Sequence, residues 1–350
     1  MARIVVLGAG VMGSAMAMPS AAMGHQIDLV GTHLDGDIIR SVSGNGFHPK
    51  LNLKLPDQVR AYEWTGLRAA DPSNADLILL GVSSAGVTWA IDRLVETLTR
   101  PVPVLMITKG LSSTLTGIEV FPAIVARELK SRLGFDVPVM AIGGPCIAGE
   151  LAALRDTMVV ITGQDQALVA RTIALLDAPF YHARASDDVI GIEICAAFKN
   201  FFALGVGWAA GRLEQADPAA NNAKMHNLAA GLFAQSLVEL RILTEALGGN
   251  PASADGLAGV GDLYVTCLAG RNSRMGRLLG LGHAYSYAKS QFMAEDTIEG
   301  AELALSIGPA LQAMWADNRL PRDRMPLALT IVDAICNDAI LQIDWERFMR

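Results

Sequence analysis

Short apolar runs alternate with stretches of helical periodicity along the first half of the chain. Six runs place mostly apolar residues at successive rather than alternate positions, at residues 4–7, 26–30, 75–80, 102–108, 137–142 and 158–162. Strands of a parallel sheet show this pattern, because helices cover both faces of the sheet. The alternation of strand and helix therefore predicts βαβ units, and with them an α/β domain built on a mostly parallel sheet.

The pattern changes near Asp187. Beyond it, apolar residues recur at helical spacing and strand signals are few. One such stretch, residues 224–247, ends at Gly248-Gly249, and glycines in this position are a helix stop signal. The sequence predicts two domains, an α/β domain over residues 1–189 and an all-helical domain over residues 190–350.

A glycine-rich turn follows the first predicted strand. Gly8, Gly10 and Gly13 lie between this strand and a stretch that can be helical, residues 14–23. In a dinucleotide-binding turn, the first glycine makes the bend, the second admits the pyrophosphate and the third lets helix and strand pack closely. The helix N-terminus adds N–H donors for the phosphates. We interpret the first domain as a Rossmann domain that binds a dinucleotide; the alternative is a glycine turn that serves packing alone.

The end of the second predicted strand bears on which cofactor is bound. An NAD site usually has an acidic residue there, about 20 residues after the turn, to bind the ribose hydroxyl groups. Here the strand ends with Thr32 and His33, whereas Asp28 lies inside it and Asp35 lies beyond the expected place. Thr32 and His33 leave room for a 2′-phosphate, although no arginine is present to bind it. This pattern favours NADP over NAD and leaves both open.

Composition and charge exclude several classes of protein. Of the 350 residues, 51% are hydrophobic and 18% charged, which excludes an intrinsically disordered chain. The net charge of −7 gives no overall basic field for nucleic acid or an anionic membrane, so an anionic ligand needs a local cluster of cations. The cysteines, Cys146, Cys195, Cys267 and Cys336, form no CxxC pair, which predicts neither a disulfide framework nor a zinc site and fits a reducing cytoplasm.

Residues 4–27 superficially resemble a signal peptide or a membrane span. They contain several glycines and Pro19, however, and lack the continuous apolar body that either segment requires. We find no other segment long and apolar enough to span a bilayer. The sequence therefore predicts a cytoplasmic protein without a membrane span.

Lys199 lies within an apolar helical stretch, residues 192–209. Its neighbours on the same helix face are apolar or small, namely Cys195, Ala196, Phe202 and Ala203. In one interpretation, its stem covers apolar surface while the ammonium reaches water. In the other, Lys199 is a catalytic acid whose pKa is lowered by burial.

Five motifs occur in one order along the chain. They are Lys109 in ITKG, the segment GGPCIAGE at residues 143–150, Lys199 and Asn200 in FKN, the segment GDLYVTC at residues 261–267, and Arg271 and Asn272 in GRN. Together with the glycine turn, this set resembles the NAD(P)-dependent sn-glycerol-3-phosphate dehydrogenases, over most of the chain up to Glu299.

The resemblance implies a cytoplasmic homodimer that interconverts dihydroxyacetone phosphate and sn-glycerol 3-phosphate, the precursor of the phospholipid backbone. It implies that Lys199 donates and accepts the proton, with Lys109 and Asp262 as further catalytic residues. The implied substrate contacts are Lys109, Gly144, Cys146, Lys199, Asn200, Asp262, Thr266, Arg271 and Asn272, with Arg271 and Asn272 binding the phosphate. The implied cofactor contacts are Gly8, Gly10, Val11, Met12, Gly13, His33, Lys109, Ala148, Arg271 and Glu299.

The chemistry agrees with these roles. Reduction of a ketone needs a hydride, which the cofactor supplies, and a proton, which a buried lysine can supply. A guanidinium offers bidentate geometry for a phosphate, which suits Arg271 in an acidic protein. Asp262 and Thr266 could instead merely cap and face a helix. No metal is expected, because the six histidines show no ligand spacing.

The chain departs from the family pattern at several places. Val11 and Met12 stand where the family usually has a tryptophan, Ser83-Ser84 lacks the usual proline, and Cys146 replaces a serine or threonine. These departures suggest a divergent enzyme, for which a four-carbon polyol phosphate is an alternative substrate. Two rival interpretations remain: a hydroxyacid, ketopantoate or opine dehydrogenase, and a nucleotide-binding sensor without turnover.

Overall fold

A mostly parallel sheet organises the first part of the chain. The computed structural model describes residues 1–114, 117–217, 219 and 221–348, and in these residues the main sheet has eight strands. Their order is β12-β11-β10-β7-β6-β1-β2-β5, and only the β10–β11 pair is antiparallel. The strands are β1 Arg3–Leu7, β2 Gln26–Val30, β5 Val59–Tyr62, β6 Leu77–Leu80, β7 Val104–Met106, β10 Val139–Gly143, β11 Thr157–Thr162 and β12 Tyr181–Ser186.

All six apolar runs of the sequence lie in strands of this sheet, so the α/β prediction is confirmed. The sequence analysis missed the two strands at the edges, β5 and β12. Most positions of both strands are exposed or only partly buried, because an edge strand has only part of its surface covered. Such strands lack the continuous apolar run by which the central strands were found.

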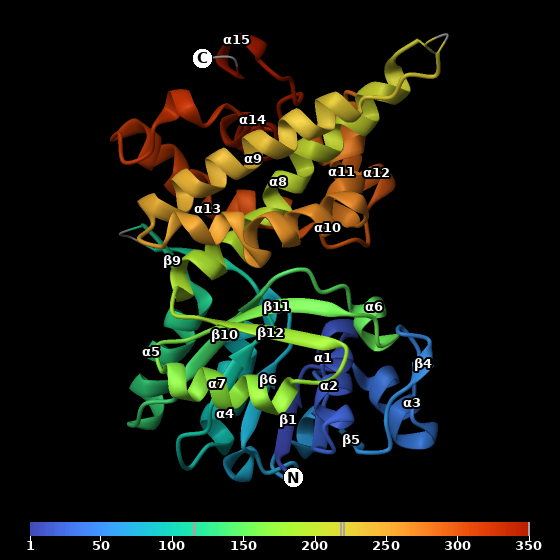
Figure 1. Ribbon diagram of the computed structural model, residues 1–350, viewed down its shortest axis with the longest axis vertical. Helices are drawn as coiled ribbons and strands as arrows, with labels where there is room; N and C mark the ends of the chain where they lie inside the picture. The colour runs from blue at the N-terminus through green and yellow to red at the C-terminus, as the bar shows by residue number, and fades with distance from the viewer. Residues whose placement is uncertain (115–116, 218, 220, 349–350) are drawn as a thin grey trace. The chain divides into compact units, whose positions relative to one another are not determined.

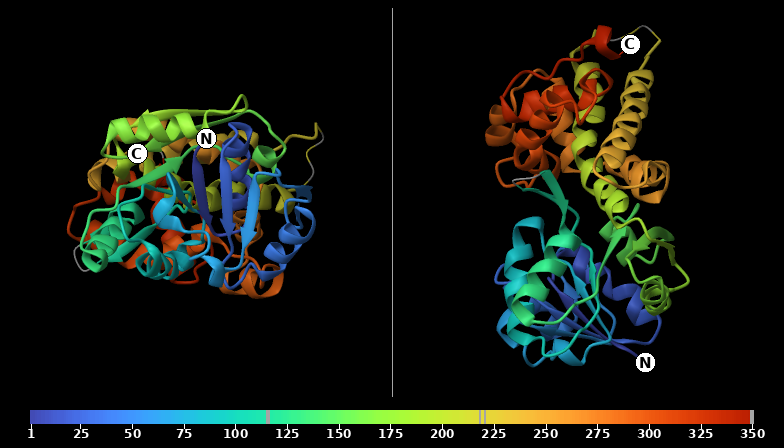
Figure 2. Two further views of the ribbon diagram at one scale, coloured as in Figure 1. Left: turned by 90° about the horizontal axis from the view of Figure 1, so that it is seen from below. Right: turned by 90° about the vertical axis from the view of Figure 1, so that its left-hand side faces the viewer.

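Helices cover both faces of the sheet (Figures 1 and 2). On one face, Val5 and Leu7 of β1 pack in a core with α4 and α5. On the other face, Ile4 and Val6 of the same strand pack with α1, α2, α3 and α7. Successive residues of β1 thus serve two cores, which explains its unbroken apolar run. These helices, with the short α6, are α1 Val11–Ala15, α2 Ala17–Ala22, α3 Gly36–Asn45, α4 Val87–Thr97, α5 Phe121–Leu133, α6 Ala148–Ala152 and α7 Gln166–Leu176.

The chain divides into two compact units. The first comprises Met1–Lys109 and Val120–Val189, and the second comprises Gly110–Glu119 and Ile190–Arg350. Among the described residues, the strands of the second unit are β8 Leu111–Thr114 and β9 Gly117–Val120, and β8 packs against α13. Its helices are α8 Val189–Gln215, α9 His226–Ala246, α10 Asp262–Leu268, α11 Arg271–Gly280, α12 Tyr285–Phe292, α13 Glu299–Ala316, α14 Pro326–Cys336 and α15 Trp345–Phe348. A further small sheet pairs β3 Phe47–His48 with β4 Leu53–Lys54.

The central helix of the second unit is α8. By length and composition it could cross a membrane, so the expectation that the chain has no segment of this kind was wrong. Its most apolar window is 83% buried within the protein, however, as expected for a core helix. The sequence could not distinguish the two, because an apolar helix buried in protein has the composition of one buried in lipid.

Helices α8 and α11 cross at very short distance. A Cβ atom at Gly276 of α11 would lie 2.2 Å from the carbonyl oxygen of Leu204 on α8. One at Gly207 of α8 would lie 2.6 Å from the carbonyl oxygen of Ser273 on α11. Any larger residue at these glycines would push the two backbones apart.

A buried carboxylate fixes the start of α14. Glu239 of α9 is fully buried, and its Oε1 and Oε2 accept hydrogen bonds from the N–H groups of Leu327 and Ala328, at 2.8 and 2.6 Å. Gln235 Nε2 donates to Oε1 at 2.8 Å. Burial raises the pKa of Glu239 to about 7, although the three donors act in the opposite direction.

We expect Glu239 to make the protein less stable as the pH rises. Its pKa in the folded state lies above the ordinary carboxyl value, so its stabilising effect is complete at low pH and is lost as the pH rises through about 7. The Glu239→Gln variant cannot titrate and should show a smaller fall in unfolding free energy between pH 5 and pH 8, measured by urea unfolding. Glu245→Gln, on the exposed side of α9, is the matched control. An unchanged slope in Glu239→Gln would contradict the assignment.

Candidate active site

The glycine turn follows β1 and requires glycine for specific reasons at two of its positions. Gly8 has a φ of +112°, a backbone conformation that residues other than glycine rarely adopt. A Cβ atom there would also lie 2.7 Å from the carbonyl carbon of Gly81. A Cβ at Gly13 would lie 2.1 Å from the carbonyl oxygen of Gly8. These two glycines are therefore needed by the fold itself.

Gly10 differs from its two neighbours in the motif. A Cβ built on it meets no protein atom within 4 Å, so the fold does not require glycine there. Among the hydrogen bonds of the described residues, none uses the backbone N–H of Gly10, Val11 or Met12, at the start of α1. Open space beside unused N–H donors suits a phosphate-bearing ligand. The residues of this turn therefore fit the diphosphate of a dinucleotide.

Two side chains that the sequence analysis did not assign hold Ala9, in the middle of the turn. The Ala9 N–H donates to Asp35 Oδ2 at 3.2 Å, and its carbonyl oxygen lies 3.2 Å from His48 Nε2. Asp35 Oδ2 also accepts from the N–H and the hydroxyl of Thr32, both at 2.8 Å. Asp35 is thus oriented toward the turn, which accounts for its position beyond the place of a ribose-binding acid.

The hydrogen bonds of His48 determine its tautomer. Its Nδ1 accepts from the Leu51 N–H at 3.1 Å, so Nε2 carries the proton and donates to the Ala9 carbonyl. The side chain is fully buried, and burial is the main reason that the pKa of His48 is lowered. A neutral ring satisfies both bonds, whereas a protonated ring would lose the bond from Leu51.

Further predicted cofactor and substrate residues lie in the first unit. His33 stacks obliquely against Trp89, with ring centroids 6.1 Å apart. Lys109 follows β7, and Gly144 follows β10 with a φ of +113°. Ala148 begins α6.

Two departures from the family pattern meet in this unit. Cys146 Sγ lies 4.0 Å from Met12 Sδ, and both side chains are partly buried against the same core. Two polarisable sulfur atoms thus fill a place where the resemblance implies an aromatic ring and a hydroxyl.

In the second unit, Lys199 of α8 forms an ion pair with Asp262, the first residue of α10. The side chain of Asp262 is 1% exposed and that of Lys199 is 13% exposed. The lysine therefore has a buried carboxylate as its partner instead of a purely apolar face. Thr266 lies one turn beyond Asp262, and its hydroxyl donates to the Asp262 carbonyl at 2.7 Å.

A network of amides lies next to this ion pair in the chain. Asn200 Nδ2 donates to Glu299 Oε2 at 3.0 Å, and Asn272 Nδ2 donates to Asn200 Oδ1 at 2.9 Å. Asn272 Oδ1 accepts from the Gly300 N–H at 2.9 Å. Arg271, which is half-exposed, lies 3.4 Å from Glu299 Oε1. The network joins α8, α11 and α13, and about half of the Arg271 side chain stays exposed beside it.

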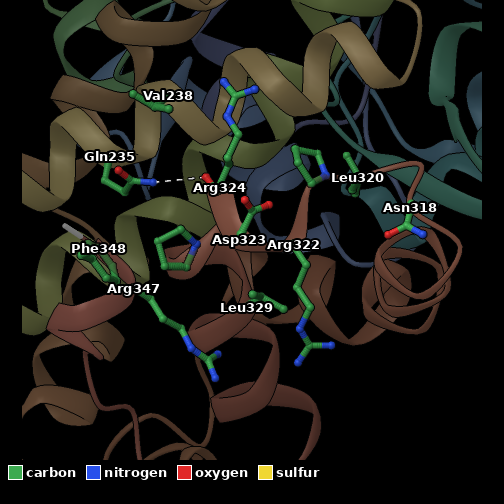
Figure 3. A pocket seen from close by; sticks show the side chains of 12 residues that line it. Gln235, Val238, Asn318, Leu320, Arg322, Asp323, Arg324, Leu329, Arg347 and Phe348 are labelled. Carbon is green, nitrogen blue, oxygen red and sulfur yellow. Dashed lines mark hydrogen bonds between the residues drawn. The ribbon is translucent and has the colours of Figure 1, made fainter. Parts of the chain in front are cut away.

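The second unit also contains a cavity of about 960 Å³, lined by Arg322, Arg324, Arg347 and Gln235 among others (Figure 3). None of the described residues that we predicted for the active site lines it. This cavity is therefore separate from the predicted active-site residues.

Comparison with known proteins identifies the family. The sequence model of the NAD-dependent glycerol-3-phosphate dehydrogenase N-terminus matches residues 3–169, and that of the C-terminus matches residues 188–342. The chain belongs to the NAD-dependent glycerol-3-phosphate dehydrogenase family. The resemblance inferred from the five motifs is therefore confirmed.

Members of this family from several organisms are similar over most of the chain. The NADP(+)-dependent glycerol-3-phosphate dehydrogenase of Archaeoglobus fulgidus is 32% identical over 282 residues, 80% of each chain. The glycerol-3-phosphate dehydrogenase [NAD(P)+] of Xylella fastidiosa is 34% identical over 342 residues, 93% of each chain. The crystal structure of glycerol-3-phosphate dehydrogenase from Coxiella burnetii matches 99% of this chain and 98% of its own, with a TM-score of 0.78 and 25% identity.

The two outer glycines of the turn and the central one should respond differently to substitution. Gly13→Ala should destabilise the protein by roughly 1–3 kcal/mol, because its methyl group overlaps the Gly8 carbonyl. Gly10→Ala should leave the melting temperature nearly unchanged and weaken binding of the dinucleotide, since only a ligand competes for that space. Thermal melts and fluorescence titration with NADPH measure the two effects. Equal loss of stability in both variants would contradict this division.

Proposed function

We propose that this protein interconverts dihydroxyacetone phosphate and sn-glycerol 3-phosphate, with NAD(P) as the hydride carrier and Lys199 as the proton donor and acceptor. The matches to both halves of the family support the reaction. The buried ion pair of Lys199 and Asp262 carries the assignment of the proton donor. The ion pair of Lys199 and Asp262 does not support the alternative of a nucleotide-binding sensor without turnover, because a sensor needs no proton donor.

The proposed reaction needs a hydride and a proton. The cofactor, when bound, supplies a hydride to the ketone carbon. The Lys199 ammonium donates a proton to the ketone oxygen and stabilises the negative charge that develops there. Asp262 orients the lysine through the ion pair, and the neutral amine accepts the proton back in the reverse direction. Lys109, Gly144, Cys146 and Thr266 are the proposed further contacts of the substrate.

The phosphate of the substrate is proposed to bind at the start of α11. Arg271 supplies an accessible guanidinium, whose paired N–H groups match two phosphate oxygens. Asn272 contributes differently from what its sequence position suggests, because both ends of its amide are already bonded to Asn200 and Gly300. We assign it mainly the task of holding Asn200 and the start of α13, with one remaining amide hydrogen for the ligand.

The diphosphate of the cofactor is proposed to bind in the first unit. The glycine turn would hold the diphosphate through the N–H groups of Gly10, Val11 and Met12. NADP is favoured over NAD, because Asp35, the first acidic residue after β2, is bonded to Ala9 and Thr32 and so is not available for the ribose hydroxyl groups of NAD. His33, Ala148 and Glu299 are proposed as further cofactor contacts. We also propose that the enzyme is a cytoplasmic homodimer.

Reduction of dihydroxyacetone phosphate tests the proposal. Purified protein should oxidise NADPH, and more slowly NADH, in its presence, followed by absorbance at the nicotinamide band. Lys199→Met should lower kcat by about 10²–10⁴-fold, because it removes the proton donor and keeps an apolar stem. Lys289→Met is the matched control, since Lys289 donates to the backbone carbonyls of Met293 and Ala294. Turnover only of a four-carbon keto-phosphate would retain the mechanism and replace the substrate.

Removal of the proposed phosphate ligand should change substrate selection. Arg271→Ala should lower kcat/KM for dihydroxyacetone phosphate by about 10–100-fold, the range expected for losing a charged hydrogen bond to phosphate. The weak activity on unphosphorylated dihydroxyacetone should not fall. Arg274→Ala, one turn further along α11, is the control, because Arg274 bonds Asp296 and the Phe292 carbonyl. An equal loss on both substrates would show that Arg271 does not bind the phosphate.

A further inference from the structure

Ala9 is held at both of its backbone polar groups by side chains from elsewhere in the first unit. Its N–H donates to Asp35, and its carbonyl accepts from His48 Nε2 and from the Ser14 hydroxyl at 3.2 Å. None of these bonds belongs to a helix or a strand. Ala9 itself is fully buried between Gly8 and Gly10. These side-chain bonds hold the middle of the turn, in addition to the backbone bond from the Gly8 N–H to the Val30 carbonyl at 2.8 Å.

We propose that Asp35 and His48 are a pair of positioning residues that hold the glycine turn ready for the cofactor diphosphate. This inference rests on the proposed function only in taking the turn as the cofactor site. Neither side chain needs to touch the cofactor. Both act through the Ala9 peptide groups, which leave the N–H groups of Gly10, Val11 and Met12 directed at the ligand.

Asp35 couples the turn after β1 to the turn after β2. A single oxygen, Oδ2, accepts from Ala9 and twice from Thr32, and the residue is 9% exposed. The backbone of Asp35 is fixed as well, because its carbonyl accepts from Ile39 in the first turn of α3. The carboxylate therefore cannot swing out to bind a ribose without releasing three donors, which would be left without a partner.

His48 secures the other side of Ala9. It lies at the end of β3, where pairing with β4 fixes its backbone. The Leu51 N–H bonded to Nδ1 sets the ring orientation, so that the Nε2 proton is directed at the Ala9 carbonyl. A turn restrained from two directions loses little conformational freedom when a ligand binds, and such preorganisation increases affinity.

Four substitutions test whether Asp35 and His48 position the turn or only stabilise the protein. Asp35→Ala removes every acceptor, whereas Asp35→Asn can keep an oxygen in the place of Oδ2. His48→Leu removes one of the two side-chain donors to the Ala9 carbonyl and leaves the Ser14 hydroxyl, whereas the amide nitrogen of His48→Gln can take the place of Nε2. His25→Leu is the matched control, because His25 accepts from the backbone N–H of Ala2 at the opposite end of β1.

The dissociation constant of NADPH, measured by fluorescence without substrate, is the first readout. Asp35→Ala and His48→Leu should each raise it by about tenfold, the range for losing one or two hydrogen bonds. Asp35→Asn and His48→Gln should lie closer to wild type. Amide hydrogen exchange of a peptide spanning residues 7–16, in protein without cofactor, should be faster in the two severe variants only. His25→Leu should lower the melting temperature without changing either readout.

The outcomes are distinct. Dissociation constants within twofold of wild type in both severe variants, with lowered melting temperatures, would overturn the proposal and leave a merely stabilising role. If a severe variant does not fold, the conservative variant at that position and the severe variant at the other decide the question. Wild-type protein that binds NADPH but reduces no keto-phosphate would overturn the proposed function alone. Wild-type protein that binds neither NADPH nor NADH would overturn both.

Discussion

The close crossing of α8 and α11 is the constraint on which the second unit depends. Gly276 and Gly207 allow the two backbones to approach to a distance at which any side chain would collide with a carbonyl oxygen. The approach fixes where along α8 the start of α11 must lie. Asn272 Nδ2 therefore lies 2.9 Å from Asn200 Oδ1. The position of Arg271 follows, because it is the residue before Asn272 in the chain. The close approach of α8 and α11 at Gly207 and Gly276 thus determines the position of the Arg271 guanidinium.

Lys199 and Asn200 are neighbours on α8 but have different partners. Asn200 follows Lys199 on α8, so the two side chains leave the helix in different directions. One pairs with the buried Asp262, and the other bonds Asn272 and Glu299. Lys199 and Arg271, the proposed proton donor and the proposed phosphate ligand, are thereby held by separate contacts, with Asp262 and Glu299 respectively. Loss of one anchor need not move the other, which is why substitutions at Lys199 and Arg271 are expected to have separable effects.

The sequence predicted the central strands and the helical second half, because burial on both faces leaves a continuous apolar signal. Its motifs also indicated roles for Lys199, Asp262 and Arg271 through the resemblance to the family, and these roles stay predictions. It did not predict β5 and β12, whose exposed faces interrupt the apolar pattern. Its treatment of α8 was incomplete, because composition does not reveal what surrounds an apolar helix.

The residues that sequence reasoning missed have backbone groups as partners. Asp35 and His48 bond the peptide groups of Ala9, and Glu239 bonds the N–H groups at the start of α14. Every residue type except proline has the same backbone N–H and carbonyl groups, so the amino-acid sequence does not indicate which backbone group a side chain will bond. A buried peptide group without a partner is costly, which makes these side chains as necessary as those of a motif. They become visible only when the fold shows which backbone groups the turns leave unpaired, and in this chain one such group lies between the first two glycines of the cofactor turn.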